Sequence, residues 1–502
     1  MFEAGDGIGG TWFWNRYPGA RFDSESYSYA YSFSQDLLDE WDWSEHFASQ
    51  PEILRYLEHV TNKFDLLKDI HLSSRVKAAN YNESNHSWGV TLDGGDTYTT
   101  RVLITAVGIL SEPTLPSLEG LDSFRGNSFH TSRWPHEQPS LKGQNVAVIG
   151  TGASGVQVIQ ELATDVDHLT VFQRRPNWCA PLHNSKIDSD EMRDIKASYP
   201  EMFEQCRTSH AGFMWTVDPR STFDVTLDER TAFWERLYAS RGMAIWQGNF
   251  KDVLVDPDAN AAMSEFMAAK IRARVHDPKI AEMLIPQDHG FGTRRVPLET
   301  NYYEAYNQSN IDLINIVKTP IVRVTESGMI TSDVEFKFDT IIYATGFDAL
   351  TGSYDRIQIQ GTTGHDIKES WDEKLETYLA LQVRDCPNMF MINGPQGLGG
   401  NHPRNIEYTV DWITDLIAYM TSHEYSRAEA TPDGIKEWTQ HIKRKSSGSL
   451  MNNVDSWMTG VNRNVKGKGT RIVGVRYGGS VETYRGLCDA VSSNGYASIN
   501  LS

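Results

Sequence analysis

The stretch QNVAVIGTGASGVQVIQELAT, residues 144–164, constrains the fold more than any other part of the chain. Its β-branched and small apolar residues predict a buried strand, and an apolar pattern with helical spacing follows a GxGxxG loop. The backbone N–H groups of such a loop and the positive end of the helix face a pyrophosphate. We therefore expect a dinucleotide-binding unit with the loop residues Gly150, Thr151, Gly152, Ser154 and Gly155. A tight turn without a ligand is the alternative.

The end of the next predicted strand, VFQRRPNW, indicates which nucleotide this unit binds. Gln173 and Arg174 stand where an NAD site carries an acid for the ribose hydroxyls. Arg174 and Arg175 instead offer planar forks of donors to a 2′-phosphate. We expect NADPH rather than NADH; the alternative is that the two arginines are an ordinary solvated pair.

The first residues, MFEAGD, are similar to the same strand end, with Glu3 in place of Gln173. An acid there favours a dinucleotide with free ribose hydroxyls, such as FAD. The glycine loop of that unit is expected about 20 residues before the acid, which puts it ahead of Met1. The sequence thus predicts an α/β fold with two Rossmann-like dinucleotide-binding domains, for FAD and NADPH, whose first FAD strand and glycine loop are missing.

Composition limits the partners and the location. The net charge of −19 argues against binding to nucleic acid. No apolar run reaches the roughly 18 residues of a membrane helix, so no integral membrane segment is expected. The four cysteines lie far apart and lack metal-site spacing, which predicts no metal and a reducing, cytoplasmic location. The oligomeric state stays open.

Two long motifs resemble the signatures of one enzyme family. FRGNSFHTSRWP, residues 124–135, is similar to the FxGxxxHxxxWP fingerprint of Baeyer–Villiger monooxygenases, and GGTWFWNRYPGARFD, residues 9–23, is similar to a second signature. The resemblance runs along nearly the whole chain. It implies FAD and NADPH as cofactors and a small-molecule ketone and O2 as reactants. The fingerprint residues are Phe124, Gly126, His130, Trp134 and Pro135.

The resemblance also implies a division of the chain. We expect an incomplete FAD-binding domain with a linker at 1–135, NADPH-binding segments at 136–185 and 286–343, a helical insertion at 186–285, and the return to the FAD domain at 344–502. The fingerprint falls on the linker.

A helix that begins near Pro403 is expected to pack one apolar stripe against the first domain: Ile406, Val410, Ile413, Ile417 and Met420.

In such enzymes NADPH reduces the flavin, and the C4a-peroxyflavin formed with O2 attacks a ketone to give an ester or lactone. The site then needs a permanent cation beside the developing oxyanion. The resemblance implies that Arg295 is this catalytic cation, that Asp23 holds it in position near the flavin, and that Arg294 reaches the 2′-phosphate. Without the resemblance, Arg294 and Arg295 would be a solvated pair in a loop.

Further cofactor contacts follow only from the resemblance. Trp457 is expected to close over the nicotinamide, although an aromatic residue there could be plain core. His130 and Trp134 are expected to couple domain movement to catalysis; hydrogen bonding and packing in a linker are the alternatives. The expected FAD contacts besides Glu3 and Asp23 are Gly10, Thr11, Trp12, Trp14, Tyr29 and Val76.

Two other functions stay open at this level. The first is a flavin monooxygenase that oxidises nitrogen or sulfur, against which the WP ending and the Asp23 and Arg295 pairing favour the ketone. The second is an impaired NADPH-binding pseudoenzyme, because the FAD glycine loop is absent from the sequence.

Overall fold

The computed structural model describes residues 1–502, and a five-stranded parallel sheet surrounds the predicted glycine loop. Its strand order is β10-β7-β6-β14-β5. β6 and β14 are buried along almost their whole length, as expected for parallel strands covered on both faces. The strands are β5 (Asn127–His130), β6 (Asn145–Ile149), β7 (His168–Gln173), β10 (Ile311–Asn315) and β14 (Thr340–Tyr343).

The helix α5 (Ala153–Leu162) begins directly after the glycine loop and follows β6, so the strand, loop and helix predicted from residues 144–164 are present. The fingerprint holds a further strand. Its residues 127–130 form β5, which pairs in parallel with β14, so this part of the expected linker is the edge of the sheet. β11 (Ile321–Thr325), β12 (Gly328–Thr331) and β13 (Glu335–Lys337) form a small antiparallel sheet before β14.

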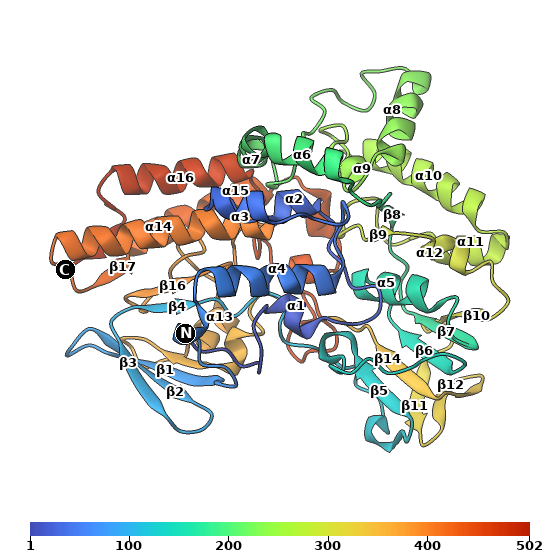
Figure 1. Ribbon diagram of the computed structural model, residues 1–502, viewed down its shortest axis with the longest axis horizontal. Coiled ribbons are helices and arrows are strands. Elements are labelled where there is room, and N and C mark those ends of the chain that lie inside the picture. The colour runs from blue at the N-terminus through green and yellow to red at the C-terminus, as the bar shows by residue number, and fades with distance from the viewer.

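Every element assigned between residues 186 and 285 is a helix, and these helices lie together at one side of the molecule (Figure 1). Local signals explain their starts. Thr226 and Glu229 form a capping box on α8, and Asp256 caps α10 ahead of a proline in the first turn. The helices are α6 (Ser189–Ala197), α7 (Tyr199–Thr208), α8 (Leu227–Ala239), α9 (Ala244–Gln247), α10 (Pro257–Arg274) and α11 (Pro278–Leu284).

Two short strands bracket this helical segment. β8 (Ala180–Pro181) and β9 (Leu298–Glu299) pair in parallel, with Ala180 opposite Leu298. The chain therefore leaves and re-enters at one place beside α5 and α12 (Tyr302–Ala305).

The other half of the molecule carries smaller sheets and the long C-terminal helices (Figure 1). β15 (Gln358–Gln360) joins β1 (Val76–Asn82), β2 (Ser87–Leu92) and β3 (Thr97–Thr100), while β4 (Leu103–Thr105) pairs in parallel with β16 (Met389–Met391). β17 (Ala428–Ala430) pairs with β18 (Ile499–Leu501). The helices are α1 (Thr11–Trp14), α2 (Ser26–Tyr29), α3 (Gln35–Glu40), α4 (Gln50–Lys63), α13 (Ile367–Glu373), α14 (His402–Ser422), α15 (Pro432–Ser446) and α16 (Val481–Ser493).

The start of the chain lies against this half. Phe2 makes an isolated parallel bridge to His71, and the N–H of Glu3 donates to the carbonyl of His71 at 2.9 Å. The expectation that a strand and a glycine loop precede residue 1 is not confirmed and stays a prediction.

The apolar stripe expected on α14 is partly wrong. Val410 is exposed, whereas Trp412, Ile413, Leu416 and Met420 are buried. The indole of Trp412 is the largest apolar side chain of the helix, and its N–H donates to the carbonyl of Cys488 on α16 at 3.0 Å. The burial of this side chain turns the helix so that Val410 faces outward. None of the helices combines the length and apolarity that a bilayer crossing requires.

Candidate functional site

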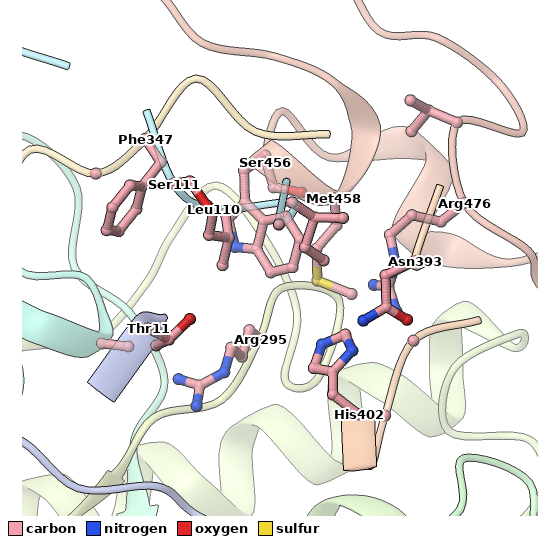
Figure 2. Close-up of a pocket in the computed structure, with 18 of the residues that line it drawn as sticks. Thr11, Leu110, Ser111, Arg295, Phe347, Asn393, His402, Ser456, Met458 and Arg476 are labelled. Carbon is pink, nitrogen blue, oxygen red and sulfur yellow. The ribbon is translucent and has the colours of Figure 1, made fainter. Parts of the chain in front are cut away.

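One cavity of about 2150 Å³ is lined by residues from both halves of the molecule. Pockets for a single small ligand measure about 300–1,000 Å³, so this space has room for more than one ligand. Figure 2 shows that Thr11 of α1 and Arg295 lie at one end of the drawn region, and that His402, Asn393 and Arg476 gather at another.

Arg295 and Asp23 form an ion pair in this cavity. Nη2 of Arg295 donates to Oδ2 of Asp23 at 2.6 Å, across 272 positions of sequence. The Asp23 side chain is 2% exposed and the Arg295 side chain 32%, so the carboxylate is enclosed while the guanidinium reaches the cavity. Burial raises the pKa of Asp23, and the charge of Arg295 opposes that shift. Nη1 of Arg295 is buried without a protein partner, which leaves a donor for a ligand.

Three arginines meet at the cavity wall beside the glycine loop; we call Arg174, Arg175 and Arg294 the phosphate cluster. Arg175 and Arg294 both approach Oδ2 of Asp288 at 3.4 Å, while Arg174 has no carboxylate partner. Burial lowers the pKa of Arg174 and of Arg294, and the neighbouring arginines lower it further. Asp288 pairs with only two of the three arginines, so positive charge stays uncompensated, and a phosphate dianion fits that excess.

The glycine loop is tightly packed on the protein side and open on the cavity side. A side chain at Gly155 would contact the carbonyl of Gly150, and Gly150 itself has φ 109°. A side chain at Gly152 would meet nothing, so the backbone is bare where a ligand would approach. The hydroxyl of Thr151 donates to the carbonyl of Arg175 at 2.9 Å and ties the loop to the phosphate cluster.

The residues expected at FAD line the same cavity. The indole N–H of Trp12 donates to the hydroxyl of Tyr29 at 3.0 Å, which fixes the first turn of the GGTWFW segment. The guanidinium of Arg133 lies 4.5 Å from the ring centre of Trp14. Oε1 of Glu3 accepts from the N–H of Gly5 at 2.6 Å. The other cavity-lining members of this set are Gly10, Thr11, Asp23 and Val76.

The fingerprint residues lie beside the cavity rather than in it. His130 is buried at the end of β5, its Nδ1 accepts from the N–H of Ser132 at 3.1 Å, and burial lowers its pKa to about 4. The buried indole of Trp134 donates to Gln138 at 2.9 Å and packs on Phe129. A side chain at Gly126 would strike the carbonyl of Asp339.

The remaining fingerprint residues, Phe124 and Pro135, do not line the cavity. Phe124 is half-buried against the β11–β13 sheet, and Pro135 ends the motif after Trp134. Trp457, by contrast, lines the cavity and is half-buried; its expected contact with the nicotinamide stays a prediction.

Several residues of the site escaped the sequence analysis. Asp288, whose pKa hydrogen bonding to His289 lowers to about 2, anchors the phosphate cluster six positions before Arg294, and that short spacing was a usable signal. His402, Asn393 and Arg476 come from three separate segments of the C-terminal part, and no motif joins them.

The chain is similar to known flavin-dependent oxidoreductases and monooxygenases in both sequence and structure. Residues 22–210 match the family model of pyridine nucleotide-disulphide oxidoreductases. Over 99% of its length the chain is 42% identical to the 2-oxo-Delta(3)-4,5,5-trimethylcyclopentenylacetyl-CoA monooxygenase of Pseudomonas putida, covering 93% of that protein. It is 36% identical to a Baeyer–Villiger monooxygenase of Pseudooceanicola batsensis, with 99% and 90% of the two chains covered. A crystal structure of OTEMO with FAD and NADP matches at a TM-score of 0.95 and 41% identity, covering 100% and 94%.

Proposed function

The chain belongs to the Baeyer–Villiger monooxygenases, and from this premise we propose which of its residues carry out the reaction. The expected fold class, cofactors and activity are confirmed: the protein is an FAD- and NADPH-dependent enzyme that uses O2 to insert oxygen beside a ketone carbonyl. The product is an ester or lactone. Oxidation of nitrogen or sulfur and a non-catalytic role are not favoured.

Bound FAD supplies the redox chemistry with O2, and NADPH supplies the electrons. We propose that Arg295 stabilises the negative charge that develops on the substrate carbonyl oxygen. A guanidinium keeps its proton at any working pH, and its unpartnered Nη1 offers the donor. Its position is fixed before substrate arrives, so little reorganisation is needed.

Asp23 is proposed as the residue that positions Arg295. The 2.6 Å contact fixes one edge of the guanidinium and leaves the other free. Because the carboxylate is enclosed, it cannot turn away to solvent. The pair also leaves little net charge in the dry site, which reduces the cost of burying the cation.

We propose that the phosphate cluster binds the 2′-phosphate of NADPH and that the open backbone at Gly152 faces its pyrophosphate. The observations in support are the uncompensated arginines and the loop tied to them by Thr151. Glu3 and the GGTWFW segment are proposed at FAD, and Trp457 at the nicotinamide. Asp288 is proposed as the counter-charge that offsets the repulsion between Arg175 and Arg294 and holds them side by side.

The division of the chain into an FAD domain, a split NADPH domain and the insertion at 186–285 is likewise proposed. It is supported by the β8–β9 pair at the base of the insertion. His130 ends β5 at the edge of the NADPH sheet. Gln138 links the neighbouring Trp134 to the carbonyl of Arg16 in the first segment. His130 and Trp134 are proposed to transmit movement between the two. Four buried free cysteines support a reducing cytoplasmic location.

The single observation that carries these roles is the Arg295–Asp23 pair in a cavity shared with the phosphate cluster. The test begins with the visible spectrum of the purified protein with added FAD, which reports flavin binding. Turnover of cyclopentanone with NADPH and ¹⁸O2 should then give a lactone with one ¹⁸O. NADPH oxidation that yields only hydrogen peroxide, or lactone without label, would contradict the proposal.

A further inference from the structure

Arg476 is a cation without a counter-charge in the wall of the cavity. Its guanidinium makes no hydrogen bond and no ion pair with the protein, and burial alone lowers its pKa to about 10. The side chain therefore stays cationic at neutral pH. The guanidinium makes a cation–π approach to Trp457, 5.6 Å from the centre of its ring. Arg476 is half-buried in the cavity wall, and a charge enclosed in this way is costly unless a ligand compensates it.

The chain makes room for this guanidinium. The position that a side chain would take at Gly399 is already filled by the head group of Arg476. Any residue other than glycine there would displace it. Gly399 lies in the segment that leads into α14, so the arginine is held between this segment and Trp457. The lack of a partner is thus a property of a fixed group and not of a free surface side chain.

Two neutral hydrogen-bonding groups lie next to it, as Figure 2 shows. His402 is the first residue of α14, and its Nδ1 is buried without a partner. Burial and the charges of Arg476 and Arg295 together lower the pKa of His402 to about 4, so the ring is uncharged and lies near both cations. Asn393 adds an amide to the same wall.

We propose that Arg476, His402 and Asn393 form a carboxylate-binding end of the substrate pocket, so that this enzyme prefers ketones that carry a carboxylate. The proposal rests on the function given above, because the ketone carbonyl must lie at Arg295. His402 stands between the two arginines, and a substrate would span it with its carbonyl at one cation and its carboxylate at the other.

A carboxylate fits this end better than a phosphate does. One guanidinium matches the two oxygens of a carboxylate, and a neutral imidazole and an amide complete its hydrogen bonding. A phosphate dianion calls for more cations, as the phosphate cluster illustrates with three arginines. The neighbours Trp457 and Met458 also line the cavity and supply apolar surface for the carbon chain between the two ends.

The test compares a series of methyl ketones that end in a carboxylate with the methyl ester of each, using FAD-loaded enzyme. We expect wild type to prefer the acids in kcat/KM. Arg476→Met should lower kcat/KM for the acids at least about 30-fold, because it removes the cation that pairs with the substrate carboxylate. It should change kcat/KM for the esters less than about twofold. Arg476→Lys should restore part of the preference, and Gly399→Ala should reduce it with the charge still present.

Arg471→Met is the matched control, since Arg471 is exposed, lies five positions away and is paired with Asp455. It should leave the acid-to-ester ratio unchanged. Equal loss for acids and esters in Arg476→Met, or a raised KM for NADPH, would overturn the proposal and indicate a cofactor contact. Wild type that converts the esters as well as the acids would overturn it too. Absence of any ester product with simple ketones would instead refute the proposed function itself.

Discussion

Replacing Arg295 by methionine should slow ester formation about 100-fold and leave flavin reduction by NADPH near the wild-type rate. The guanidinium acts on charge that develops at the substrate carbonyl, and hydride transfer from NADPH builds no such charge. Methionine keeps much of the side-chain length, so the change removes mainly the cation and its donors. The two half-reactions therefore separate the proposed role from a general loss of structure.

The magnitude follows from the geometry of the pair. A unit charge about 4 Å from a developing oxyanion is worth about 4 kcal/mol at an effective dielectric constant of about 20. Because 32% of the Arg295 side chain is exposed, we discount this value for solvent screening to about 3 kcal/mol. At about 1.4 kcal/mol per factor of ten, that corresponds to about a 100-fold change in rate. Loss of one preorganised donor costs a similar factor in other enzymes.

Anaerobic mixing with NADPH, followed at the flavin absorbance, measures the reductive step. Product analysis after aerobic turnover measures ester formation in the same preparation. Ester formation by Arg295→Met at more than about a tenth of the wild-type rate would refute the reasoning, since it would show that the cation is dispensable. Equal loss of both steps would point to damaged cofactor binding instead. A flavin spectrum at wild-type occupancy is the control for folding.

Three further outcomes follow from contacts described above. Arg174→Ala should raise KM for NADPH at least about tenfold with little change for NADH, because only the phosphorylated cofactor uses the phosphate cluster; equal changes would contradict this. Gly155→Ala should lower Tm because its side chain meets the carbonyl of Gly150, whereas Gly152→Ala should weaken NADPH binding at unchanged Tm. His130 has a folded pKa of about 4 against about 6.5 in the unfolded chain. Folding therefore favours its neutral form, and stability should fall as pH drops from about 6.5 towards 4. His130→Gln should flatten that fall in Tm, and an unchanged slope would refute the assignment.

The sequence predicted those parts of the structure that are continuous along the chain. The strand, glycine loop and helix of residues 144–164 are local, and the helical segment carries its own caps. The predicted stripe on α14 was partly wrong because spacing alone does not show which neighbour a helix packs against. The bulky Trp412, hydrogen-bonded to α16, is buried, and Val410 is exposed instead.

The carboxylate-binding end was beyond sequence reasoning for a different reason. Arg476, His402 and Asn393 are ordinary residues in their own segments, and only the packing around Gly399 leaves the guanidinium without a partner. Whether a charged side chain has a partner depends on residues from distant parts of the chain, so no local sequence pattern predicts that Arg476 is unpaired. Asp23 and Arg295 are still farther apart, at 272 positions, and the sequence pairs them only because both fall in motifs that resemble those of one family.

Because Asp23 and Arg295 lie 272 positions apart, their ion pair can form only late in the synthesis of the chain. At about 5–20 residues per second, a ribosome needs about 14 to 54 seconds to add Arg295 after Asp23. During that interval Asp23 lacks its cation, and the GGTWFW segment lacks the part of the cavity wall that Arg295 belongs to. The nascent chain must therefore keep an aromatic segment from aggregating until more than half of the protein has been made, which makes the early segment a natural client for chaperones.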